Sequence, residues 1–152
     1  RALVPPMLAA GARADTVNLS SVGRLSVAPF QGAYIASKFA VQALTECLFM
    51  ELETIGAPIG VSVVNPGPVA TRIFEDAEAA EDGTGSDTYR TTMRTMLRDQ
   101  GLTPAQTAEI IFDGVADGRF WIFPQPDMAE EVIRRRADML LHRTPPKGRR
   151  VD

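Results

Sequence analysis

The chain has 152 residues, 45% of them hydrophobic, and a formal net charge of −3, which favours one folded domain and argues against a nucleic-acid binder. Its single cysteine and single histidine exclude an intrachain disulfide and a multi-cysteine zinc site, leave a Ser-His-acid hydrolase without support, and predict no metal site. No apolar run reaches ~18 residues and no signal-peptide pattern occurs, so we expect no membrane span. The single cysteine fits a reducing, cytoplasmic setting.

Strand and helix patterns alternate along the chain. In chain order they predict the tail of a helix over 1–12, a strand over 15–20, a helix over 33–55, a strand over 60–65, an irregular segment over 72–102 that holds a short helix, a helix with a capping box at Thr103, a strand over 120–123 and a final helix over 126–142. This alternation indicates right-handed crossovers and a parallel sheet with helices on both faces. The predicted fold class is therefore α/β.

Side-chain patterns add expectations about burial. Pro5 and Pro6 could kink the first helix. The helix over 33–55 is apolar around most of its circumference, so it lies deep in one domain or also packs against a second subunit. Cys47 in this helix is expected to be a buried, inert thiol. The helix after Thr103 is expected to bury one stripe, made of Ala108, Ile111, Phe112 and Val115.

Three side chains indicate chemistry at a carbinol or a ketone. Tyr34 and Lys38 are four residues apart, which places them on one face of a helix. A phenol normally titrates near pH ~10, and a nearby ammonium group favours its ionised form. Such a tyrosine can exchange a proton with a substrate oxygen near neutral pH. Ser21 stands thirteen residues before Tyr34, and its hydroxyl can hold a carbonyl or an alcohol in place.

A Pro-Gly turn is expected beside these residues. Ser21 and Pro66-Gly67 each follow the carboxyl end of a predicted strand. Ligands of parallel sheets bind outside the carboxyl ends of the strands. Glycine at position 67 would leave room for a ligand where a side chain would collide. The two segments therefore predict one site at one edge of the sheet.

The segments that carry these residues read T-V-N-L-S-S-V-G over 16–23, Y-I-A-S-K over 34–38 and V-S-V-V-N-P-G-P-V-A-T over 61–71. In this order they resemble the V-N-x-S-S-x-x-G, Y-x-x-x-K and P-G-x-V-x-T segments of the short-chain dehydrogenase/reductase (SDR) family. The resemblance covers residues 1 to about 124. It implies part of a Rossmann-type doubly wound parallel sheet, from which the N-terminal dinucleotide-binding half is absent.

The resemblance also implies a division of the chain. Residues 1–142 would be the C-terminal half of a single Rossmann-type domain, with a substrate-binding lid over 72–102 and a C-terminal helix over 126–142. Residues 143–152 are expected to form a disordered tail.

The resemblance implies an NAD(P)-dependent oxidoreductase that interconverts an alcohol and a ketone or aldehyde by hydride transfer. Tyr34 would be its general acid/base, and Ser21 would orient the substrate oxygen. Lys38 would favour the ionised tyrosine and bind the ribose of the nicotinamide. Val69 would meet the carboxamide through its main chain, and Thr71 would use its hydroxyl on the carboxamide or the diphosphate. The predicted cofactor-binding residues are Tyr34, Lys38, Pro66, Gly67, Val69 and Thr71.

The predicted partners follow from the same resemblance. The corresponding helix of the family often forms a dimer interface, which favours a homodimer or homotetramer here. Methionines and aromatic residues over 72–102 suggest a small apolar alcohol or carbonyl substrate, although a plain packing helix explains them equally well. Asn18 matches a structural asparagine of the family and is expected to bridge neighbouring strands.

One family feature has no match in this sequence. These 152 residues hold no glycine-rich turn between a strand and a helix for a pyrophosphate. We therefore expect a fragment, or part of a longer enzyme, in which the residue that separates NAD from NADP lies before Arg1. Two alternatives stay open. One is the epimerase/dehydratase branch of the superfamily, and the other is a non-catalytic dimerisation or regulatory fragment.

Overall fold

The computed structural model of the chain describes residues 3–76 and 86–147. Its elements, in chain order, are α1 (Val4–Ala10), β1 (Ala14–Leu19), the 3₁₀ helix η1 (Val22–Leu25), α2 (Gly32–Thr54), β2 (Ile59–Val64), α3 (Ile73–Asp76), α4 (Ser86–Gln100), α5 (Pro104–Ala116), β3 (Trp121–Ile122) and α6 (Pro126–Leu141). Within the described residues, no helix is both long and apolar enough to cross a membrane.

The strands form one parallel sheet in the order β1-β2-β3. The central strand β2 is buried along almost its whole length, which is typical of a parallel strand covered on both faces. The side chains of β1 alternate between half-buried and exposed. This sheet confirms the predicted α/β class.

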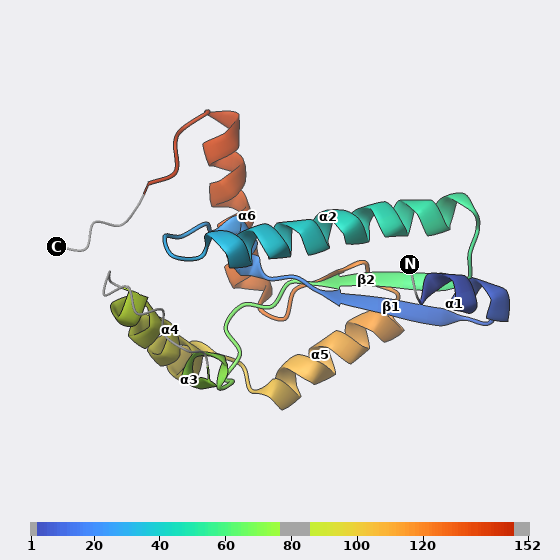
Figure 1. The fold of residues 1–152 in the computed structure, drawn as a ribbon, viewed down its shortest axis with the longest axis horizontal. Helices are drawn as coiled ribbons and strands as arrows, with labels where there is room; N and C mark the ends of the chain where they lie inside the picture. Colours follow the sequence, from blue (N-terminus) through green and yellow to red (C-terminus); the bar gives the residue numbers. More distant parts are fainter. Residues whose placement is uncertain (1–2, 77–85, 148–152) are drawn as a thin grey trace.

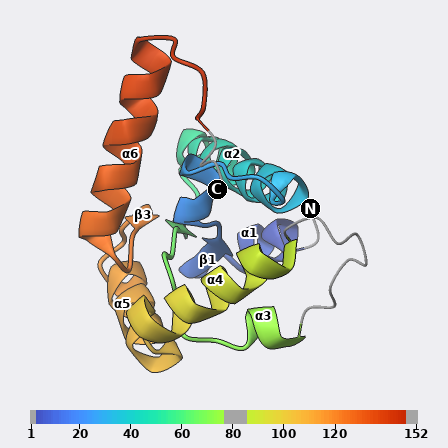
Figure 2. The ribbon, with the colours of Figure 1, turned by 90° about the vertical axis from the view of Figure 1, so that its left-hand side faces the viewer.

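Helices cover both faces of the sheet. Figure 1 shows α2 along one face and α5 along the other, and it shows α3 and α4 beyond the end of the sheet where β1 and β2 terminate. Figure 2, seen from that end, shows α4 in front of β1. The core between α2 and the sheet is built on Leu52, Ile59 and Val61, and Phe49 packs there against Phe120 with ring centroids 4.8 Å apart.

The helix ends follow local chemistry. Thr103 and Gln106 form the predicted capping box, because each side chain bonds to the backbone of the other residue. Pro5 and Pro6 lie in the first turn of α1, where a missing N–H breaks no intrahelical hydrogen bond. They begin the helix and do not kink it.

Two expectations about burial are wrong in this structure. Cys47 is exposed, because α2 turns Gln42, Thr45 and Leu52 inward instead. Phe112 is 73% exposed, because α5 turns Thr107 and Gly114 inward. A β-carbon added at Gly114 would lie only 2.8 Å from Ile122, so the small residue allows this close packing. All four residues of the predicted stripe, Phe112 included, line an open apolar hollow of about 310 Å³ together with Val17 and Leu19.

The predicted lid and tail are described only in part. Residues 77–85 of the lid and residues 148–152 of the tail lie outside the described residues. The short helix predicted within the lid is α4, whose Leu97 is buried. The predicted C-terminal helix is α6, which ends one residue before the predicted limit.

Candidate active site

The predicted site segments meet because β1 and β2 are neighbours in the sheet. The N–H of Ser20 donates to the carbonyl of Val64 at 2.8 Å, which continues the pairing one residue beyond β1. The N–H of Val22 then donates to the carbonyl of Pro66 at 3.1 Å. The start of η1 and the Pro66-Gly67 turn are therefore bonded to each other at the carboxyl edge of the sheet.

Ser21 and Ser20 point in different directions, as the strand period predicts. Ser21 caps η1, and its Oγ accepts the N–H of Gly23 at 3.0 Å. The hydroxyl proton of Ser21 remains available to a substrate oxygen. Ser20 turns toward α2, where its Oγ donates to the carbonyl of Lys38 at 2.9 Å. Ser20 therefore positions the helix, and Ser21 faces the site.

Tyr34 and Lys38 share one face of the first turns of α2. The Nζ of Lys38 lies 5.7 Å from the centroid of the Tyr34 ring. This Nζ donates to the carbonyl of Leu19, the last residue of β1, at 3.0 Å. An ammonium group has three donors, so this bond leaves two for a ligand. Tyr34 is 41% exposed, and its hydroxyl has no hydrogen-bond partner among the described residues.

Gly23 shows that Ser21 and Tyr34 border the same space. A β-carbon built on Gly23 would lie 3.1 Å from the Oγ of Ser21 and 3.8 Å from Cε1 of Tyr34. The sequence contains this glycine within its first motif, but no role for it was predicted. A residue without a side chain here lets the serine hydroxyl and the tyrosine ring approach one small substrate group.

Gln125, just before α6, holds the Pro-Gly turn. Its Oε1 accepts the N–H of Gly67 at 2.9 Å, and its Nε2 donates to the carbonyl of Pro68 at 2.6 Å. A β-carbon on Gly67 would meet the Sδ of Met128 at 3.0 Å and the Gln125 side chain at 3.2 Å. The room that Gly67 leaves is thus filled by this chain itself. Contacts of Pro66 and Gly67 with a cofactor stay predictions.

Val69 and Thr71 leave polar groups unpaired beyond the turn. Val69 forms an isolated bridge with Leu102, and its carbonyl accepts the N–H of Thr71 at 2.8 Å. Among the described residues, neither the N–H of Val69 nor the hydroxyl of exposed Thr71 has a hydrogen-bond partner. Both groups are available to a ligand at this edge.

A buried arginine, Arg24, lies beneath the site and bonds to the residue before the Pro-Gly turn. Arg24 of η1 donates from Nε to the Oδ1 of Asn65 at 3.2 Å, and both side chains are buried. Burial lowers the pKa of Arg24, and the charge of Glu46 opposes that shift. The guanidinium lies 5.8 Å from the centroid of the Phe39 ring on α2. The sequence patterns did not single out Arg24, because its partners lie far along the chain.

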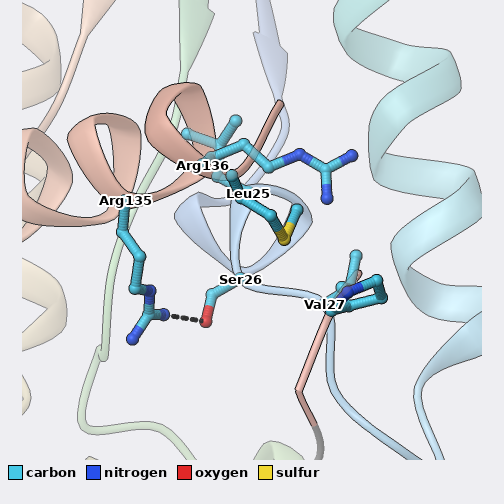
Figure 3. Close-up of a pocket in the computed structure, with 7 residues that line it drawn as sticks. Leu25, Ser26, Val27, Arg135 and Arg136 are labelled. Atoms are coloured by element: carbon cyan, nitrogen blue, oxygen red, sulfur yellow. Dashed lines mark hydrogen bonds between the residues drawn. The ribbon is translucent and has the colours of Figure 1, made fainter. Parts of the chain in front are cut away.

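Two arginines of helix α6 contact residues next to the candidate site. Arg136 lies 5.9 Å from the centroid of the Phe39 ring. Arg135 donates to the Oγ of Ser26 at 2.9 Å beside a cavity of about 90 Å³ (Figure 3). Helix α6 therefore contacts both Ser26, just after η1, and Phe39 on α2.

The side chain of Asn18 does not bridge neighbouring strands, contrary to the prediction from the sequence. Its Nδ2 donates to the Oγ1 of buried Thr45 at 3.0 Å, so this amide joins β1 to α2 and not to a neighbouring strand.

Among residues 3–76 and 86–147, no group of three or more His, Cys, Asp or Glu side chains could hold a metal ion.

The family follows from comparison with known proteins. A family model described as short chain dehydrogenase matches residues 1–82, and the chain belongs to this family. Dehydrogenase/reductase SDR family member 7B of Xenopus laevis is 37% identical over 120 residues, which are 78% of this chain and 34% of that protein. The C alpha-dehydrogenase of a Sphingobium species is 32% identical over 132 residues, which are 84% of this chain and 43% of that protein.

A solved structure agrees with the fold. The short chain dehydrogenase/reductase of Burkholderia phymatum in complex with NAD superposes with a TM-score of 0.84 at 30% identity, over 95% of this chain and 54% of that one. The fold is therefore part of a Rossmann-type SDR sheet, as predicted. This chain spans less than half the length of the two relatives and about half of the solved structure.

Proposed function

We propose that this chain carries the proton-transfer residues of an NAD(P)-dependent oxidoreductase that interconverts an alcohol and a ketone or aldehyde. The main support is that Ser21 and Tyr34 border one space at Gly23, with the ammonium of Lys38 beside the Tyr34 ring. Membership of the short-chain dehydrogenase family supports an oxidoreductase in general terms.

Each residue has a distinct role in this proposal. The hydroxyl of Ser21, already fixed by the N–H of Gly23, donates to the substrate oxygen. The free hydroxyl of Tyr34 exchanges a proton with the same oxygen. Lys38 holds its ammonium group 5.7 Å from the centroid of the Tyr34 ring. Its bond to the carbonyl of Leu19 fixes the position of that charge.

The proposed cofactor is NAD or NADP, which supplies or accepts the hydride when it is bound. Unpaired polar groups at the carboxyl edge fit such a ligand. They are the remaining protons of Lys38, the N–H of Val69 and the hydroxyl of Thr71. Lys38 would bind ribose hydroxyls, and Val69 and Thr71 would hold the carboxamide end. The likeness to a structure that contains NAD adds support.

Two variants test this function in the longest natural chain that contains these residues. Tyr34→Phe removes only the hydroxyl, and we expect turnover to fall ~10²–10⁴-fold while the cofactor Kd stays nearly unchanged. Ser21→Ala removes a donor to the developing charge, and we expect a loss of about 10²-fold or more in kcat. Ser37→Ala is the matched control, because the exposed Ser37 bonds only to the carbonyl of Tyr34 within the helix.

The outcomes separate the roles clearly. Turnover of Tyr34→Phe within a factor of a few of the wild type would remove Tyr34 from the mechanism. Equal losses in Ser21→Ala and Ser37→Ala would show that the loss comes from general disturbance of the fold.

A further inference from the structure

Three aromatic side chains gather beyond the carboxyl edge of the sheet, and one of them, Phe30, lies four residues before Tyr34. The Tyr89 ring of α4 lies 6.4 Å from the Phe30 ring and 6.5 Å from the Phe74 ring, measured between centroids. The Phe74 and Tyr89 planes are inclined at 77°, an edge-to-face arrangement that aromatic rings prefer. Three separate segments of the chain thus bring their rings together at one place.

The cluster lies close to the proposed proton donor Tyr34. Burial raises the pKa of the Tyr89 phenol, and the neighbouring Tyr34 raises it further. Geometry places the cluster near the same residue, because Phe30, whose ring lies 6.4 Å from that of Tyr89, is four residues before Tyr34 and just before the start of α2. The cluster therefore lies near the N-terminal end of α2, which carries Tyr34.

Phe30 has a backbone conformation that packing alone does not explain. Its φ is +65°, in the left-handed region that favours glycine and asparagine and is costly for a bulky residue. The Phe30 side chain is nevertheless 61% exposed, so its ring gains little burial in return. Strained backbone of this kind gathers at functional sites, where it aims a side chain.

The helix that carries Tyr89 is fixed to the site. The Nη2 of Arg94 donates to the carbonyl of Phe74 at 3.0 Å, which joins α4 to α3. After α4, Leu102 exchanges hydrogen bonds with Ala70 and Pro68, beyond the Pro-Gly turn. These bonds anchor α4 to α3 and to the segment that follows the Pro-Gly turn.

We propose that Phe30, Phe74 and Tyr89 form an aromatic wall of the substrate site, and that the preferred substrate carries an aromatic ring next to the reacting carbinol or carbonyl carbon. This inference rests on the proposed oxidoreductase function and names its substrate class. A substrate ring would join the exposed face of the cluster, while its oxygen meets Ser21 and Tyr34.

The test compares two ketones with the same carbon skeleton in the longest natural chain that contains these residues. Acetophenone carries an aromatic ring, and cyclohexyl methyl ketone carries a saturated one. The measured quantity is the ratio of their kcat/KM values, which cancels losses common to both. We expect Tyr89→Leu to lower this ratio about three- to tenfold, the range for one aromatic pair. Tyr89→Phe keeps the ring and should keep the ratio.

Two further variants and one pair of inhibitors test the same aromatic wall. Phe30→Gly removes a ring and relaxes the backbone, and we expect it to lower the ratio as Tyr89→Leu does. Phe112→Leu, an exposed aromatic residue on α5, is the control and should leave the ratio unchanged. One measurement needs no variant: benzyl methyl ether should inhibit the wild type at least about threefold more tightly than cyclohexylmethyl methyl ether.

Failure of this inference differs from failure of the proposed function. Turnover of both ketones with a ratio that Tyr89→Leu and Phe30→Gly leave unchanged would overturn the aromatic wall and keep the oxidoreductase. Equal inhibition by the two ethers would overturn the wall as well. No reduction of any ketone or aldehyde with NADH or NADPH would overturn the function itself.

Discussion

Arg24 and Asn65 form a buried hydrogen bond, 3.2 Å from Nε to Oδ1, that joins the two halves of the candidate site. Arg24 lies three residues after Ser21, and Asn65 directly precedes the Pro66-Gly67 turn. The Nδ2 of Asn65 is buried without a partner among the described residues. The bond to Arg24 is thus the side-chain hydrogen bond that holds Asn65 in place.

We expect Arg24→Met to lower the free energy of unfolding by about 1–3 kcal/mol, because it leaves the buried Oδ1 of Asn65 unpaired. For a chain of this size that corresponds to a loss of roughly 2–4 °C in Tm per kcal/mol. Urea unfolding measures the change, with exposed Arg13→Met as the control. A change within about 0.5 kcal/mol, equal to that of the control, would show that the bond contributes little.

Gln125 provides a second prediction, because both polar atoms of its amide bond to the Pro-Gly turn. Gln125→Leu removes both bonds and should cost about 1–3 kcal/mol of stability, at about 0.5–1.5 kcal/mol for each bond. Gln125→Glu keeps an acceptor for Gly67 but loses the donor to Pro68. Its free energy of unfolding should therefore lie between those of Gln125→Leu and the wild type. Unfolding free energies of both variants, with exposed Gln100→Leu as the control, test this order. Equal stability of the Leu and Glu variants would contradict it.

Local patterns predicted the elements well, because they depend on period and on caps. The strands and the long helix begin and end within about a residue of their predicted limits. The capping box at Thr103 formed as expected, since all its groups lie within four residues. Motifs predicted Ser21, Tyr34 and Lys38 as site residues, and this stays a prediction. The structure brings the three together at the carboxyl end of β1.

Other features depend on contacts that no local pattern reveals. Gln125 reaches Gly67 across 58 residues, and its own surroundings in the sequence contain no motif. The position of Tyr89 beside Phe30 and Phe74 follows from the packing of α4. Cys47 and Phe112 were predicted to be buried because their helices are apolar, but periodicity does not say which apolar face the same chain covers.

The uncovered flank of α2 leads to a prediction about assembly. Leu44 is 70% exposed in the middle of this helix, beside exposed Cys47 and Met50 at helical spacing. We infer that a second copy of the chain covers this flank. Leu44→Lys should raise the dissociation constant of a dimer at least about tenfold, as loss of a central apolar contact does. Leu140→Lys, a similarly exposed site on α6, is the control.

Light scattering over a range of concentrations measures this assembly, and thiol labelling checks the location. Cys47 should react slowly in the assembled wild type and quickly in Leu44→Lys. A wild type that stays monomeric at all concentrations would refute the predicted interface.

The last prediction concerns residues 1–152 expressed on their own, which we expect not to bind NAD or NADP measurably. A pyrophosphate is normally held by backbone N–H groups at a glycine-rich turn and the N-terminus of a helix. No such turn occurs in this sequence. Lys38, Val69 and Thr71 would contact only the nicotinamide end, which leaves the charged centre of the cofactor without partners.

The exposed side of the sheet makes the same chain prone to association. Strand β1 is an edge strand among the described residues, and Val17, Leu19 and Phe112 border the open apolar hollow of about 310 Å³ beside it. An unpaired edge next to exposed apolar side chains invites pairing with another chain. Calorimetric titration of the purified chain with each cofactor, on a sample whose size is checked by light scattering, tests the prediction. Micromolar affinity in a folded sample would show that these residues contain a complete cofactor site, because the nicotinamide-end contacts alone are too few for that affinity.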